Sequence, residues 1–249
     1  MIAKSATVLF AVCSVTLTWQ GHFTSKATGD PLTKRVRILA AGDSITEGYY
    51  DRDGGYRRFL VDWLAPYADF DFVGPLGSDP LRHYAIAGIG GQELAVKLGR
   101  VVVNEAPDII LLHVGKVDLI RSLLRKQGSH EAAQNVIHAI RASVDAACDT
   151  EVALGRRPIV LLHELLPIGD LFDGIDELRI VDEINDLLHR EVVEPRRHAG
   201  YPVDLIATVV PVDVEDLADG VHPLPGGVGF RKLATDYWAA LLGFSFSSL

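Results

Sequence analysis

The stretch Arg37-Ile38-Leu39-Ala40-Ala41-Gly42-Asp43-Ser44-Ile45-Thr46-Glu47-Gly48 decides the fold of this chain. Its residues 38–41 are apolar without alternation, which predicts a strand that is buried on both faces. Gly42 ends this strand, and apolar side chains at helical spacing follow over residues 59–64. A buried strand that leads through a short turn into an amphipathic helix is the repeating unit of an α/β sheet.

The same alternation continues to the end of the chain and predicts one α/β domain. Strands are expected at 37–41, 69–73, 109–114, 159–162 and 205–210, and helices around 59–64, 94–102, 136–144, 178–192 and 230–241. Because the strands are apolar throughout, we expect a parallel sheet covered by helices on both faces. In such sheets ligands bind beyond the carboxyl ends of the strands, so the site is expected there.

Composition excludes several classes of function. The chain has 249 residues, with 24 Lys and Arg against 33 Asp and Glu, so its formal charge is 24 − 33 = −9. This acidic balance argues against nucleic acid, whose phosphates need a basic surface. The two cysteines, Cys13 and Cys148, cannot form a disulfide framework. No CxxC or HExxH motif indicates a metal site, and Cys148 is expected to be a buried apolar residue.

The N-terminal residues read as a separate segment. Lys4 is followed by a mostly apolar stretch over residues 6–19, which is too short and too polar to span a membrane. It resembles a secretory signal without a clear small-x-small cleavage site. We therefore expect a signal peptide at 1–20, a polar leader at 21–34 and the α/β domain at 35–249, in a secreted monomer that does not bind membranes. A disordered leader is the alternative.

Residues at two strand ends suggest acyl-transfer chemistry. Ser44 follows the first strand, where a hydroxyl suits a nucleophile and a backbone N–H suits an oxyanion donor, although serine is also a common helix N-cap. Asp219 precedes His222 by three residues, before the last helix. A carboxylate so placed can bond one ring nitrogen and leave the other free to take a proton from serine. Each signal alone is weak, and together they favour a serine hydrolase.

Three blocks resemble the SGNH (GDSL) hydrolase family, in the family's order and across residues 35 to about 242: Gly42-Asp43-Ser44-Ile45-Thr46, Gly88-Ile89-Gly90-Gly91 and Asp219-x-x-His222. The resemblance implies a three-layer flavodoxin-like fold with a five-stranded parallel sheet. It also implies Ser44, Asp219 and His222 as the catalytic triad, with the backbone N–H groups of Ser44 and Gly91 as oxyanion donors. The G-x-S-x-G elbow of α/β-hydrolases is absent around Ser44. This chemistry needs no cofactor.

One block departs from the family pattern. Where the family reads Gly-x-Asn-Asp, with the asparagine as the third oxyanion donor, this chain reads Gly115-Lys116-Val117-Asp118. Loss of one such donor typically lowers turnover by about 10²–10³-fold. We therefore expect a weakened enzyme, unless Lys116 or another group compensates for Val117. Asp118 matches the structural aspartate of the family and is expected to accept a hydrogen bond that braces a loop.

Shorter motifs point to the substrate. Gly54-Gly55-Tyr56-Arg57-Arg58, Asp71-Phe72-Val73-Gly74 and His113-Val114-Gly115 look like the acetylxylan-esterase branch of the SGNH carbohydrate esterases. An esterase acting on acetylated carbohydrate is thus expected, with Asp43, Tyr84 and Glu164 as candidate substrate contacts. Tyr49 and Tyr50, with Tyr84, could form a sugar-stacking rim or merely pack. The alternatives are a short-chain lipid or aryl esterase and a non-catalytic binder of acylated carbohydrate.

Overall fold

We analysed a computed structural model, which describes residues 35–51, 53–150, 155–169, 171–206 and 208–243. The predicted signal peptide, the polar leader and Cys13 lie outside the described residues. Within them, no helix is both long and apolar enough to cross a bilayer.

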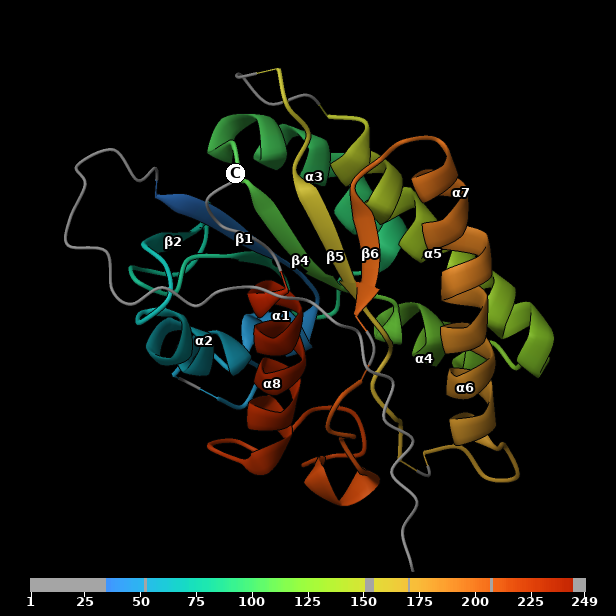
Figure 1. Cartoon of the computed structure of the whole chain (residues 1–249). Helices are drawn as coiled ribbons and strands as arrows, with labels where there is room; N and C mark the ends of the chain where they lie inside the picture. The colour runs from blue at the N-terminus through green and yellow to red at the C-terminus, as the bar shows by residue number, and fades with distance from the viewer. Residues whose placement is uncertain (1–34, 52, 151–154, 170, 207, 244–249) are drawn as a thin grey trace, which may run out of the picture. The chain divides into compact units, whose positions relative to one another are not determined.

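A parallel sheet forms the centre of the described unit (Figure 1). Its strands run in the order β2 (Phe70–Val73), β1 (Val36–Gly42), β4 (Ile109–His113), β5 (Ile159–His163) and β6 (Val203–Ile206). The pairing of β1 with β4 puts Gly42 opposite His113, so the two strands end at the same edge. The α/β class and the parallel sheet are confirmed.

The sheet differs from the five-strand prediction by one short strand. Tyr84 and Ala85 form β3, which pairs in parallel with Ala41 and Gly42 at the end of β1. A strand of two residues leaves no periodic pattern in a sequence, so it could not be read from one.

Helices cover both faces of the sheet, and alternate residues of each strand pack against different helices. Leu39 and Ile110 belong to one apolar cluster, together with buried residues of α3 (Gly91–Glu105), α4 (Lys116–Leu124), α5 (Ser129–Cys148) and α6 (Glu177–Leu187). Ile38 and Leu111 belong to a second cluster on the other face, with buried residues of α2 (Tyr56–Leu64) and α8 (Val228–Leu242). Figure 1 shows these two helix layers on either side of the strands. This arrangement explains the uninterrupted apolar strands, because neither face meets solvent.

The remaining elements are short. α1 is a single turn (Ser44–Glu47), a π-helical stretch (Leu188–Val193) and α7 (Glu194–His198) extend α6, and a 3₁₀ turn (Val214–Asp216) follows β6. Cys148 is free and fully buried, as predicted.

Candidate active site

Ser44 lies at the carboxyl edge of the sheet because β1 turns directly into α1. The strand needs glycine at position 42, since a Cβ there would lie 2.0 Å from the carbonyl oxygen of His113. The Asp43 carboxylate then accepts the N–H of Ile45 at 3.0 Å and caps α1. Ser44 is therefore the first residue of the helix, and it is 7% exposed.

A buried arginine closes the other end of α1. Arg57 is 2% exposed and donates to the backbone carbonyl oxygens of Thr46, Glu47 and Leu81. So short a helix leaves the carbonyls of Thr46 and Glu47 without backbone partners, and a guanidinium can satisfy several carbonyls at once. Arg57 thus fixes the turn that carries Ser44.

His222 and Asp219 are joined by a local hydrogen-bonded turn. One carboxylate oxygen of Asp219 accepts the backbone N–H of His222 at 2.8 Å and that of Val221 at 3.0 Å. The other lies 2.8 Å from Nδ1 of the His222 ring. Although partial burial opposes the shift, these hydrogen bonds hold the pKa of Asp219 below its usual range.

The structure brings Ser44 and His222 into contact from opposite ends of the domain. Nε2 of His222 lies 2.8 Å from Oγ of Ser44. Because the carboxylate of Asp219 accepts from Nδ1, the proton of a neutral ring resides there and Nε2 is free to accept the serine proton. The geometry is that of an activated nucleophile.

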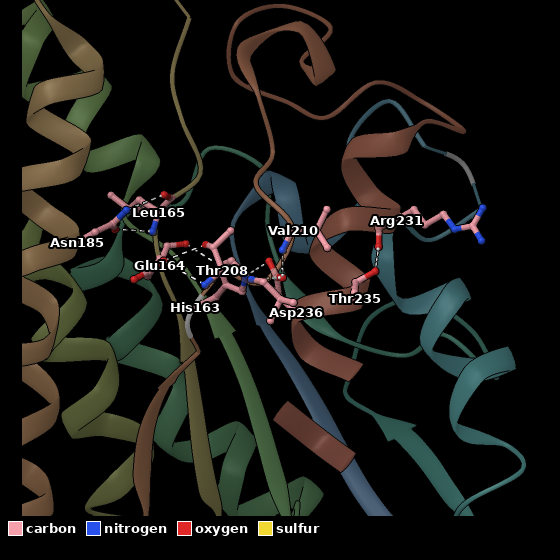
Figure 2. Close-up of polar contacts among 10 residues, drawn as sticks. His163, Glu164, Leu165, Asn185, Thr208, Val210, Arg231, Thr235 and Asp236 are labelled. Atoms are coloured by element: carbon pink, nitrogen blue, oxygen red, sulfur yellow. Dashed lines mark hydrogen bonds and ion pairs between the residues drawn. The ribbon is translucent and has the colours of Figure 1, made fainter. Parts of the chain in front are cut away.

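His163 and Asp236 are buried and anchor the chain that follows β6 and leads to Asp219 (Figure 2). Nε2 of His163, the last residue of β5, lies 3.1 Å from the carboxylate of Asp236 in α8, and both residues are 0–1% exposed. The second oxygen of Asp236 accepts the N–H groups of Val209 and Val210 at 2.8 and 3.1 Å. The chain after β6 is therefore tied to the sheet edge and to α8.

Glu164, which the sequence analysis named as a candidate substrate contact, belongs to this same scaffold. Its carboxylate accepts the hydroxyl of Thr208 at 2.9 Å (Figure 2). The backbone of Leu165 next to it exchanges two hydrogen bonds with the Asn185 side chain, at 2.8 and 3.0 Å. Glu164 thus braces the exit from β6 and does not line the cavity that contains Ser44.

A cavity of about 430 Å³ opens over the serine and the histidine. It is lined by Ser44, Tyr49, Tyr50, Ala87, Gly88, Lys116, Val117, Ile120, Asp219, Val221 and His222. Among the described residues, no cluster of histidine, cysteine and carboxylate side chains is suited to hold a metal ion. The size of the cavity and its mixed lining suit a small acyl group and part of a larger substrate.

Two tyrosines form the rim beside the imidazole. The ring centroid of Tyr49 lies 4.8 Å from that of His222, and the centroid of Tyr50 lies 5.6 Å from it. Both rings are about half exposed, at 44% and 51%. Tyr84 does not join them, because it is 5% exposed and packs in the core. Its assignment as a substrate contact was wrong.

Asp43 is also buried, contrary to its assignment as a substrate contact. Its side chain is enclosed beneath Ser44, with 0% exposure, and one of its oxygens caps α1. Burial raises the pKa of Asp43 to about 7. The carboxyl group therefore acts on the position of α1 and does not face the cavity.

The predicted second oxyanion donor is otherwise engaged. The N–H of Gly91 donates to Oδ2 of Asp118 at 2.9 Å, and Gly91 does not line the cavity. Asp118 braces the loop, as predicted, and it thereby removes Gly91 from the expected role. The glycine that lines the cavity is Gly88, which is exposed and has a positive φ of 77°.

Val117 lines the cavity at the position where the resemblance leads one to expect asparagine. The preceding residue, Lys116, is 1% exposed, and its Nζ donates to the carbonyl oxygen of Pro167 at 2.6 Å. Burial lowers the pKa of Lys116 to about 7, while the charges of Asp43 and Asp219 oppose this shift. The site thus contains an apolar side chain and a buried amine side by side.

The chain belongs to the GDSL-like lipase/acylhydrolase family, whose model matches residues 38–228. This match confirms the SGNH resemblance. A multidomain esterase from Ruminococcus flavefaciens is 26% identical over 231 residues, which cover 82% of this chain and 28% of that protein. The chain therefore spans less than a third of the length of this relative.

Solved structures of carbohydrate esterases share the fold. A family 3 carbohydrate esterase from Clostridium thermocellum is 20% identical with a TM-score of 0.60, covering 83% of this chain and 94% of that one. A family 3 enzyme from Talaromyces cellulolyticus is 19% identical with a TM-score of 0.64, covering 84% and 97%. The acetylxylan esterase Axe2 from Geobacillus stearothermophilus is 18% identical with a TM-score of 0.58, covering 85% and 95%.

Proposed function

We propose that the chain is a serine esterase that removes acetyl groups from carbohydrates. The observation that carries the proposal is the hydrogen-bonded series Ser44–His222–Asp219, with contacts of 2.8 Å at both steps, inside a cavity of about 430 Å³. A serine hydroxyl, a correctly tautomerised imidazole and a low-pKa carboxylate suit the hydrolysis of an ester through an acyl-enzyme.

The reaction follows from the positions of these groups. His222 takes the proton of Ser44 as Oγ attacks the ester carbonyl, and Asp219 stabilises the resulting imidazolium. The backbone N–H of Ser44, at the start of α1, is the expected donor to the oxyanion. His222 then gives its proton to the leaving alkoxide. A water molecule, deprotonated by the same ring, hydrolyses the acyl-enzyme and releases the acid.

Acetylated carbohydrate is supported as substrate by two observations. The fold matches enzymes described as carbohydrate esterases and as an acetylxylan esterase. In addition, half-exposed Tyr49 and Tyr50 border the cavity, where their rings offer apolar faces to a sugar. Secretion, which would bring the enzyme to an extracellular polysaccharide, rests on the signal-like residues 1–20 alone.

Acetate release from a panel of acetylated polysaccharides tests this function. Acetylated xylan, acetylated mannan and acetylated pectin are incubated with the protein and with Ser44→Ala, and free acetate is measured. Release by the protein and none by Ser44→Ala supports the proposal. Hydrolysis of p-nitrophenyl acetate without release from any polysaccharide would favour the short-chain aryl esterase instead. Binding of acetylated polysaccharide without any hydrolysis would favour the non-catalytic binder, the role that Val117 suggests.

A further inference from the structure

We propose that the Lys116 ammonium supplies the positive charge that stabilises the oxyanion in place of the side chain that Val117 lacks. This inference rests on the proposed esterase function and adds a group to the same site. It starts from the buried position of Lys116, because a lysine is almost never fully buried unless its charge has a partner.

The position of the ammonium is fixed from two sides. Lys116 begins α4 directly after Gly115, which makes a sharp turn at the end of the β4 loop with a φ of 123°. Its Nζ donates to the carbonyl oxygen of Pro167 in the loop after β5, at 2.6 Å. A side chain held at both ends is preorganised, so it loses little freedom when charge develops nearby.

Lys116 belongs to the cavity in which the ester reacts. It lines the same 430 Å³ space as Ser44, Val117 and His222. An ammonium has three N–H donors, and among the described residues its one hydrogen-bond acceptor is Pro167. The other two N–H bonds and the charge then act on the reacting group, because the charge of a buried ammonium is weakly screened.

The electrostatic surroundings make this charge selective for the transition state. Burial lowers the pKa of Lys116 to about 7, so the resting site stabilises the ammonium poorly. A negative charge that forms on the substrate oxygen stabilises the protonated form of Lys116, and this stabilisation arises only as the reaction proceeds. An interaction that is stronger in the transition state than in the ground state raises kcat and leaves KM little changed.

Several titratable groups surround Lys116, and their effects on activity must be distinguished from its own. Asp43 beneath Ser44 and Asp219 of the triad loop act on it by their charges, and its own charge helps to lower the pKa of His113 at the end of β4. Burial also raises the pKa of Asp43 to about 7, so this carboxyl titrates in the same range. The test therefore needs variants at both Lys116 and Asp43.

The test compares p-nitrophenyl acetate hydrolysis by the protein with four variants: Lys116→Met, Lys116→Arg, Val117→Asn and the Lys116→Met/Val117→Asn pair. We expect Lys116→Met to lower kcat about tenfold or more with KM within about twofold, and Lys116→Arg to recover part of the loss. In the Val117→Asn background, where an amide donor is restored, Lys116→Met should lower kcat by at most about a third of the factor seen in the unmodified protein. Equal costs in the two backgrounds would show a purely structural role and overturn the proposal.

The pH profile provides a second readout, which also serves if Lys116→Met does not fold. The protein's kcat should fall as pH rises through about 7, where Lys116 loses its proton. Lys116→Arg should lack this decrease because a guanidinium stays protonated. Asp43→Asn should keep the decrease but shift it to lower pH, because the charge of Asp43 raises the pKa of Lys116. A decrease that persists in Lys116→Arg contradicts the proposal. If Ser44→Ala is inactive and Lys116→Met retains the wild-type kcat, only the role of Lys116 fails. If Ser44→Ala is fully active, the proposed function fails with it.

Discussion

The backbone N–H of Gly91 donates to the carboxylate of Asp118 at 2.9 Å, which joins the start of α3 to the first turn of α4. This bond turns a predicted oxyanion donor into a structural one. For the proposed esterase, this bond leaves fewer preorganised oxyanion donors than the sequence motif suggests.

Asp118→Ala should destabilise the fold by about 1–3 kcal/mol, because it leaves the buried N–H of Gly91 without an acceptor. Chemical denaturation with linear extrapolation measures this loss. Asp118→Asn is the matched control, since its amide oxygen can still accept, and it should lose clearly less. Equal losses in the two variants would show that the hydrogen bond contributes nothing specific.

Val117→Asn should raise turnover of p-nitrophenyl acetate about tenfold or more, because the amide adds a donor at a site short of one. The kcat of the variant against that of the protein is the measurement. Val117→Leu, which changes shape without adding a donor, is the control. An unchanged or lower kcat in Val117→Asn would mean that the cavity has adapted around valine.

Asp43→Asn should alter the pH dependence of stability in a defined window. Burial raises the folded-state pKa of Asp43 from 3.8 to about 7, so its protonated form stabilises the fold fully below pH 3.8. That contribution is lost as pH rises through about 7. The unfolding midpoint of the variant, relative to that of the protein, should therefore increase between these pH values. A difference that is constant with pH would contradict the assignment.

Tyr49→Ala should raise KM for an acetylated xylo-oligosaccharide about two- to tenfold, the effect of losing one aromatic contact. The ring lies 4.8 Å from the His222 ring at the cavity rim. KM for p-nitrophenyl acetate should change less, because the smaller ester needs less of the rim. Tyr67→Ala, at a tyrosine that is 54% exposed and outside the cavity, is the control. Equal effects on both substrates would remove Tyr49 from sugar recognition.

The sequence predicted the sheet because buried parallel strands have an unmistakable apolar pattern. The prediction fails where backbone N–H groups bond to a side chain and not to a neighbouring strand. The last strand was predicted at 205–210 but ends at Ile206, because the N–H groups of Val209 and Val210 bond to Asp236 instead of a neighbouring strand. No local pattern marks an aspartate 26 residues away as their acceptor.

The candidate site was predictable in its three polar residues and not in its surroundings. Ser44, Asp219 and His222 stand in motifs with fixed spacing, whereas Asp43, Tyr84 and Glu164 were chosen only for their place near strand ends. Asp43 and Tyr84 turned out to be buried, and Glu164 accepts a hydrogen bond from Thr208 outside the cavity. Burial depends on the packing of distant helices, which no local motif encodes. The sequence did single out Lys116, since it adjoins Val117, but its enclosure could be seen only in three dimensions.

The central claim is that the 2.8 Å contact between Ser44 and His222 makes this serine a nucleophile. The most direct measurement is the initial rate of p-nitrophenyl acetate hydrolysis by the protein and by Ser44→Ala, at equal concentration and matched thermal stability. We predict that the variant loses activity by about 10³-fold or falls to the uncatalysed rate. Equal rates for the two proteins would contradict the account.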